Sequence, residues 1–283
     1  MYPRYAPYVT GADAVESLTV EVFGVTVAVT ADPQHITAVR RFLPPSAQPV
    51  RDPPERGRFA LVKDDVAGLM RIERDDESIT GSADLRLALD MLDAELRMYI
   101  ALHAPNFIFV HAGVVGVAER AIVLPGRSFA GKTTLVAALV QAGAEYWSDE
   151  YAVLDADGLV HPYTKPLSVR INNTRETDEQ TIESLGGRAG DRPLPVAVIA
   201  FTSYRPGAAW TLSARTAGEG AVKLLEHSIA ARSRPEQVLA TVRRAVTNAE
   251  VIEGERGNAD QAATALLSLQ ALGWQSASAP HTC

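Results

Sequence analysis

The sequence contains a single cysteine, Cys283, which excludes an intramolecular disulfide and a zinc site built on cysteines. It has no apolar run approaching the roughly 20 residues that a membrane helix needs. The first ten residues, MYPRYAPYVT, lack the apolar stretch of a signal peptide. We therefore expect a cytoplasmic protein with no membrane contact.

Positive charge is also in short supply. Lys and Arg number 27 against 34 Asp and Glu, and the formal net charge is −7. Such a chain gains little from counterion release on DNA or RNA, so we do not expect a nucleic-acid partner. The chain has 283 residues, of which 47% are hydrophobic, and this is enough for one large globular domain or two ordinary ones.

The N-terminal part is predicted to be rich in strands. Over residues 17–30, SLTVEVFGVTVAVT, apolar and other side chains alternate, which predicts a hairpin bent at Gly24. Residues 1–16 are predicted to be a loose tail, and the prolines of 43–57 predict a loop. Short strands are predicted near 58–63 and 68–73. Together they predict a small β-rich N-terminal unit over residues 1–81.

An amphipathic helix is predicted next, over 82–103, because apolar residues recur there mostly every three or four positions. Ser82 is a candidate for its N-cap. We expect residues 82–105 to connect the N-terminal unit with the remainder of the chain.

The remainder, residues 106–274, alternates strand and helix patterns, which favours an α/β layer. Strands are predicted over 107–124 (two), 145–148, 151–154 and 195–203, and helices over 132–142, 218–231, 235–248 and 258–272. A polar, mobile loop is predicted over 172–193, with a short helix within it as the alternative, and 275–283 is predicted to be a disordered tail.

One motif carries a strong chemical signal. Residues 126–133, GRSFAGKT, match the P-loop or Walker A pattern G-x-x-x-x-G-K-[ST] between a predicted strand and a predicted helix. Glycines let successive N–H groups converge on phosphate oxygens, and the helix directs its positive end at the same place. The expected nucleotide-binding residues are Gly126, Arg127, Ser128, Phe129, Ala130, Gly131, Lys132, Thr133 and Thr134.

A P-loop works with an acidic partner from a neighbouring strand, and Asp149 and Glu150 are the candidates. One carboxylate can orient Mg²⁺ together with the Thr133 hydroxyl, which makes Thr133 and Asp149 the expected metal ligands. The other can accept a proton from an attacking hydroxyl. His111 lies on the apolar strand before the loop, where a lone histidine is more often a core residue than a catalyst.

The order of a His111-Ala112-Gly113 strand, a P-loop and an acidic pair resembles the catalytic domain of HPr kinase/phosphorylase and its serine-kinase-like relatives. HPYTKPLSVR, at 161–170, is similar to the stretch that follows the acidic pair in that family. The resemblance covers about 107–170 well, 195–232 weakly and none of 1–80. It implies an α/β P-loop kinase domain, here with the smaller β-rich unit in front.

The resemblance also implies roles, with ATP and Mg²⁺ bound at the P-loop and His111 tuning the acidic pair. Asp149 matches the first acid of the family. Glu150 stands where the family has the aspartate that acts as base, so it departs from the pattern by one methylene. The resemblance makes Arg215 a candidate for the family's C-terminal arginine, and family members often form oligomers.

The leading hypothesis is therefore an ATP-dependent kinase that phosphorylates a hydroxyl, with Glu150, Asp149, His111 and Lys132 as the catalytic set. The expected acceptor is a serine of a protein or peptide, with a small molecule as the alternative, and Asn172–Arg192 could close over it. Two other functions stay open, an NTPase switch and a nucleotide-binding sensor or scaffold without catalysis. Arg256 could contact phosphate, although a solvated turn is the simpler interpretation of Arg256-Gly257.

Overall fold

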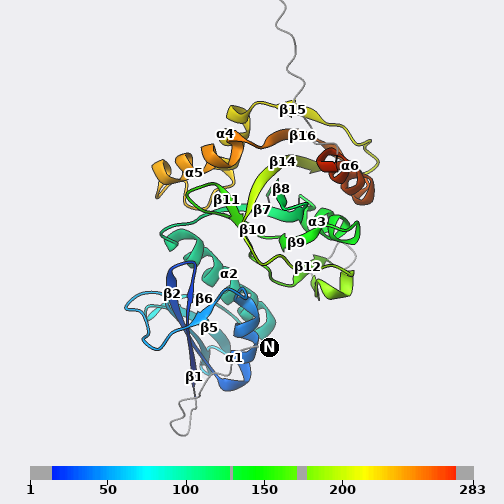
Figure 1. Cartoon of the computed structure of the whole chain (residues 1–283). Helices are drawn as coiled ribbons and strands as arrows, with labels where there is room; N and C mark the ends of the chain where they lie inside the picture. The colour runs from blue at the N-terminus through cyan, green and yellow to red at the C-terminus, as the bar shows by residue number, and fades with distance from the viewer. Residues whose placement is uncertain (1–14, 128–129, 171–176, 272–283) are drawn as a thin grey trace, which may run out of the picture. The chain divides into compact units, whose positions relative to one another are not determined.

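The computed structural model describes residues 15–127, 130–170 and 177–271. The chain divides into two compact units, Met1–Phe107 and Ile108–Cys283, and its fold is mixed α/β (Figure 1). Nearly all of the predicted tail at 1–16 and the whole of that at 275–283 lie outside the described residues. Among the residues described, no helix is both long and apolar enough to cross a membrane.

The first unit is built on a six-stranded sheet in the order β3-β1-β2-β4-β5-β6. Its strands are β1 (Glu16–Val22), β2 (Val25–Ala31), β3 (Gln48–Pro49), β4 (Arg58–Asp64), β5 (Leu69–Arg74) and β6 (Glu77–Ser82). The predicted hairpin is confirmed, because β1 and β2 pair antiparallel from Glu16↔Ala31 to Val22↔Val25. Gly24 turns the chain with a φ of 77°, which a residue with a Cβ rarely adopts.

Two helices complete this unit. Helix α1 (Pro33–Phe42) was not predicted, and it begins where the Asp32 carboxylate accepts the N–H of Gln34. Helix α2 (Leu85–His103) is capped by Asp84, which accepts the N–H groups of Arg86 and Leu87, and not by Ser82. Helix α2 packs on β5 and β6, so the segment expected as a connector is part of the first unit.

The second unit holds an eight-stranded sheet in the order β11-β10-β7-β8-β14-β16-β15, with β9 beside β7. Its strands are β7 (Ile108–Val117), β8 (Arg120–Pro125), β9 (Glu145–Ser148), β10 (Tyr151–Leu154), β11 (Leu159–His161), β14 (Leu194–Tyr204), β15 (Ser213–Arg215) and β16 (Glu250–Arg256). A separate pair is formed by β12 (Leu167–Arg170) and β13 (Thr177–Gln180). Because β11 pairs with both β10 and β14, five of these strands close into a ring.

The predicted strands of this unit are confirmed, and the apolar run at 195–203 is the buried strand β14 between β8 and β16. Strands β11, β12, β13, β15 and β16 were not predicted, and β13 lies within the segment 172–193 that was predicted as a polar loop. The helices are α3 (Lys132–Gln141), α4 (Ala217–Glu226), α5 (Pro235–Thr247) and α6 (Ala259–Ala271), with a short 3-10 helix η1 (Glu183–Leu185). Helix α4 ends at Glu226, before the predicted residue 231.

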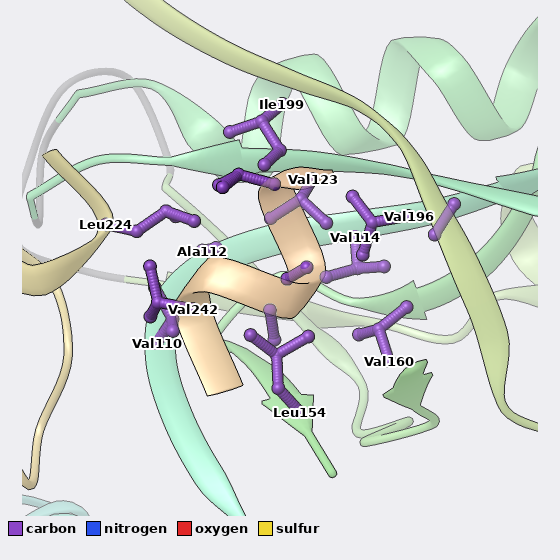
Figure 2. Close-up of a cluster of buried hydrophobic side chains, with 14 of the residues drawn as sticks. Val110, Ala112, Val114, Val123, Leu154, Val160, Val196, Ile199, Leu224 and Val242 are labelled. Carbon is purple, nitrogen blue, oxygen red and sulfur yellow. The ribbon is translucent and has the colours of Figure 1, made fainter. Parts of the chain in front are cut away.

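Two hydrophobic clusters flank β14. Val196 and Ile199 belong to the cluster that α4 and α5 cover, with Val242 of α5 among strand side chains such as Val110 (Figure 2). Ala197 and Ala200 belong to the other cluster, which α3 and α6 cover. Figure 1 shows α4 with α5 and α3 with α6 on the two sides of the strands. This packing fixes the start of α3 next to the ends of β8 and β16.

Candidate functional site

The described residues between β8 and α3 make close backbone contacts at the end of the sheet. The N–H of Gly126 donates to the carbonyl of His111 at 3.3 Å, and that of Ala130 donates to the carbonyl of Arg127 at 3.2 Å. Gly131 has a φ of 78° and lets the chain turn directly into α3. Ser128 and Phe129 lie outside the described residues.

Helix α3 begins without a side-chain cap and has no acidic residue in its first turn. Its first N–H groups therefore face the loop with the positive end of the helix dipole, as an anion-binding site requires. The sequence prediction of a strand, a loop and a helix over 120–141 is confirmed.

Lys132 curls back over the loop. Its Nζ donates to the carbonyls of Gly126, at 2.9 Å, and Arg127, at 3.1 Å, and lies 3.5 Å from Nε2 of His111. Burial lowers the pKa of Lys132, while the negative charges of Glu150 and Asp149 act in the opposite direction. The ammonium group is thus a partly desolvated cation held at the mouth of the loop.

Asp149 lies immediately after β9 and is held by two hydroxyl groups. The Thr133 hydroxyl donates to Oδ2 at 3.1 Å, and the Tyr146 hydroxyl donates to Oδ1 at 3.0 Å. Burial raises the pKa of Asp149, and the neighbouring Glu150 raises it further, although both hydroxyl bonds favour the ionised form. Asp149 and Thr133 therefore present two oxygen atoms side by side at the start of α3.

Glu150 has a different environment from Asp149. The Ser148 hydroxyl accepts the N–H groups of Glu150 and Tyr151 at 3.0 and 2.9 Å, and so turns the chain between β9 and β10. Glu150 Oε1 lies 3.7 Å from Nε2 of His111, and these side chains are 34% and 23% exposed. The turn thereby separates a carboxylate held by two hydroxyl groups from one that is about one-third exposed beside His111.

The structure brings most of the predicted site residues together. His111, Lys132, Thr133, Asp149 and Glu150 form one connected cluster, and the described part of the loop carries Gly126, Arg127, Ala130 and Gly131. Thr134 is exposed in the first turn of α3, and no contact to the cluster is recorded for it.

Two expectations from the weaker signals are corrected. Arg215 lies on β15 and pairs with Glu253 at 2.8 Å instead of joining the cluster. The expected lid, Asn172–Arg192, lies partly outside the described residues, but its later part is tied down. The N–H of Tyr146 donates to the carbonyl of Arg188, and the N–H of Gly190 donates to the carbonyl of Tyr146, both at 2.8 Å.

Two residues that shape the site carry no functional signal in the sequence. Tyr146 is predicted only as part of the strand at 145–148, yet its hydroxyl holds Asp149. The carbonyl of His227 accepts the N–H of His111 at 2.8 Å, and burial lowers the pKa of the His227 imidazole. Arg256, which the sequence offers as a possible phosphate contact, is only 2% exposed and donates to the carbonyl of Gly131 at 2.6 Å, so the simpler interpretation of a solvated turn was wrong.

Thr133 and Asp149 suit a magnesium ion that phosphates also hold. The described residues contain no group of three or more His, Cys, Asp or Glu that could hold a metal alone. Mg²⁺ needs only one or two protein ligands when phosphate oxygens and water supply the others. A hydroxyl and a carboxylate 3.1 Å apart fit this requirement.

Comparisons with known proteins leave the site to be interpreted on its own chemistry. Neither the protein-family models nor the curated proteins give a match to this chain. The class that the structure establishes is a mixed α/β protein of two units, in which the segment GRSFAGKT runs from the end of β8 to the start of α3.

Proposed function

We propose that this chain is an ATP-dependent kinase that transfers the γ-phosphoryl group to a hydroxyl. The observation that carries the proposal is the cluster at the start of α3, where Lys132 and Thr133 meet Asp149 and Glu150. It supplies, in one place, a cation for phosphates, a pair of oxygens for Mg²⁺ and a reachable carboxylate. Phosphoryl transfer requires these groups, because its catalysis is mainly positioning and charge stabilisation.

The loop and α3 would bind the phosphate chain of ATP. The loop N–H groups and the helix terminus face the phosphates, and Lys132 moves from the carbonyls of Gly126 and Arg127 to the β- and γ-phosphates. Thr133 and Asp149 would hold Mg²⁺, which neutralises charge on the phosphates when bound.

Glu150 is the proposed base because its carboxylate is 34% exposed, whereas two hydroxyl groups hold the carboxylate of Asp149. It accepts the proton of the acceptor hydroxyl while the acceptor oxygen forms its bond to the γ-phosphorus. The bond between that phosphorus and the β,γ-bridging oxygen breaks, and ADP leaves. His111, 3.7 Å from Glu150, orients the carboxylate and adjusts its charge.

The proposed acceptor is a serine of a protein or peptide, or else a small molecule with a hydroxyl, in the cytoplasm. The serine acceptor and a homo-oligomer rest on the resemblance to HPr kinase/phosphorylase over 107–170, whereas the cytoplasm is proposed from the single cysteine and the first ten residues. Glutamate in place of the family's aspartate extends the base by one methylene, so Glu150 would reach an acceptor held slightly farther from Asp149.

The first test is thermal unfolding with and without Mg-ATP for the native chain and for Lys132→Ala. A ligand at 100 times its Kd stabilises by about 2.7 kcal/mol, which raises the midpoint of a unit of this size by about 5–11 °C. We expect this shift in the native chain and its loss in Lys132→Ala. Lys63→Ala is the matched control, since Lys63 is an exposed lysine of the first unit.

The second test separates the three functions that the sequence left open. A kinase consumes ATP slowly until an acceptor is added, and Glu150→Gln should abolish the added rate while leaving the Mg-ATP shift intact. Acceptor-independent turnover would favour the NTPase switch, and binding without turnover would favour the sensor. A folded native chain with no Mg-ATP shift would remove the proposal altogether.

A further inference from the structure

Arg256 lies at the same end of the sheet as the phosphate loop. Strands β8, β14 and β16 run parallel, and Arg256 ends β16 in register with Tyr204 of β14. Strand β8 ends at Pro125 and leads directly into the loop. Since the carboxyl ends of parallel strands meet at one edge of a sheet, β16 delivers Arg256 to the edge where α/β proteins bind their ligands.

The guanidinium of Arg256 is buried against the loop. Its Nη2 donates to the carbonyl of Gly131 at 2.6 Å, and the N–H of Leu135 donates to the same oxygen at 3.1 Å. The Nε of Arg256 is buried without a hydrogen-bond partner, and its Cζ lies 5.4 Å from the centroid of the Tyr204 ring. Across 15–127, 130–170 and 177–271, no carboxylate pairs with Arg256.

The adjacent carboxylate, that of Glu255, does not serve as the counter-ion of Arg256. Glu255 points to the other side of β16 and pairs with Arg205 at 2.6 Å. Burial lowers the pKa of Arg256, but an arginine in a protein stays protonated. The chain therefore keeps a full positive charge, 2% exposed and without a counter-ion among the described residues, directly behind the first turn of α3.

A buried charge without a partner destabilises the folded chain. A carbonyl oxygen compensates only part of the charge of a guanidinium, so an anion at the loop would lower the free energy of this arrangement. The loop in front of Gly131 is where the proposed function puts the phosphate chain of a nucleoside triphosphate.

We propose that Arg256 is a positioning residue of the phosphate site, which anchors Gly131 and supplies an uncompensated positive charge in addition to the charge of Lys132. The inference rests on the proposed function, because the phosphate chain is the anion that it invokes. Replacing Arg256 by an apolar side chain should weaken phosphate binding and, unlike the loss of a structural contact, should not destabilise the ligand-free protein.

The experiment compares the native chain with Arg256→Met, Arg256→Lys, Lys132→Ala and the control Arg205→Met, an arginine that is 63% exposed. Affinities for Mg-ATP and for inorganic tripolyphosphate are measured by calorimetry, and ligand-free unfolding midpoints are measured separately. We expect Arg256→Met to bind both ligands about 10- to 100-fold more weakly, with a midpoint equal to or above that of the native chain. Arg256→Lys should recover part of the affinity, and Arg205→Met should match the native chain.

The outcomes separate the inference from the function it depends on. If Lys132→Ala loses binding while Arg256→Met binds like the native chain, the inference is wrong and the proposed function stands. If Arg256→Met lowers the ligand-free midpoint, the hydrogen bond to Gly131 outweighs the cost of the buried charge, and the inference of an uncompensated charge is overturned. If the native chain binds neither ligand, the proposed function fails and the inference fails with it.

Discussion

Gly113 of β7 lies directly under helix α3, and its replacement by alanine tests what fixes the position of that helix. A Cβ at residue 113 would lie 2.6 Å from Cγ2 of Val136, closer than real Cβ atoms come to their neighbours. Val136 is fully buried in α3, so it cannot turn into solvent to make room. The alanine must therefore push the helix or force Val136 out of its preferred rotamer.

The size of the effect follows from the packing. Adding a methyl group to a filled core costs about 1–3 kcal/mol. Val136→Ala alone removes two methyl groups, and it should cost about 2 kcal/mol at about 0.8 kcal/mol per buried group plus a cavity term. In the double variant the new methyl group occupies part of the space that Val136 leaves. We therefore expect the double variant to be about 1–2 kcal/mol more stable than the sum of the single changes predicts.

Urea unfolding followed by tryptophan fluorescence measures this coupling in the full chain. The three tryptophans, Trp147, Trp210 and Trp274, all belong to residues 108–283, so the signal reports the second unit. Gly218→Ala is the matched control, because a Cβ at that position in α4 meets nothing closer than 4.0 Å. It should be neutral or stabilising by up to about 1 kcal/mol. Strictly additive free energies for Gly113 and Val136 would refute the argument that this contact sets the position of α3.

Two further variants test the positions of single side chains. Tyr146→Phe removes the hydroxyl between Asp149 and the carbonyl of Lys165, and should lower the urea stability of the second unit by about 1–3 kcal/mol; an unchanged value would mean that the hydroxyl holds neither group. Asp84→Ala removes the cap of α2 and should cost about 1 kcal/mol. This loss should appear in circular dichroism and leave the tryptophan transition unmoved, whereas an equal effect from Ser82→Ala would restore Ser82 as the cap.

The parts of the fold that the sequence predicts well are those with a local cause. The alternation of apolar and other side chains over 17–30 is enough to predict the first hairpin, because the two-residue period of a strand can be seen in consecutive residues. The loop at 126–131 is equally local, since its glycines and the helix that follows are contiguous. Helix α1 was missed because its single strong signal, the Asp32-Pro33 start, precedes a segment with few apolar residues.

The parts that were missed depend on contacts between distant segments. Strand β16 is recognised as a strand through its pairing with β14 and β15, and neither of these strands is close to it in the sequence. Tyr146 has a strand pattern that predicts burial and is silent about its hydroxyl, whose partner Asp149 reaches it only because Ser148 turns the chain. The sequence predicts a division of roles within the acidic pair, but it does not show the Tyr146 hydroxyl that holds Asp149 or the turn at Ser148 that separates the two carboxylates.

Gly131 is the residue at which the local and the distant requirements meet. The motif has glycine there because the turn into α3 needs a φ of 78°. This requirement is local, since it involves only three or four neighbouring residues. Arg256, 125 residues further along the chain, imposes the same choice independently, since a Cβ on residue 131 would lie 2.5 Å from Nη2. A side chain at 131 would therefore strain the turn and also displace the buried cation. Gly131 thus also makes room for Arg256, a contact that a short sequence pattern cannot include.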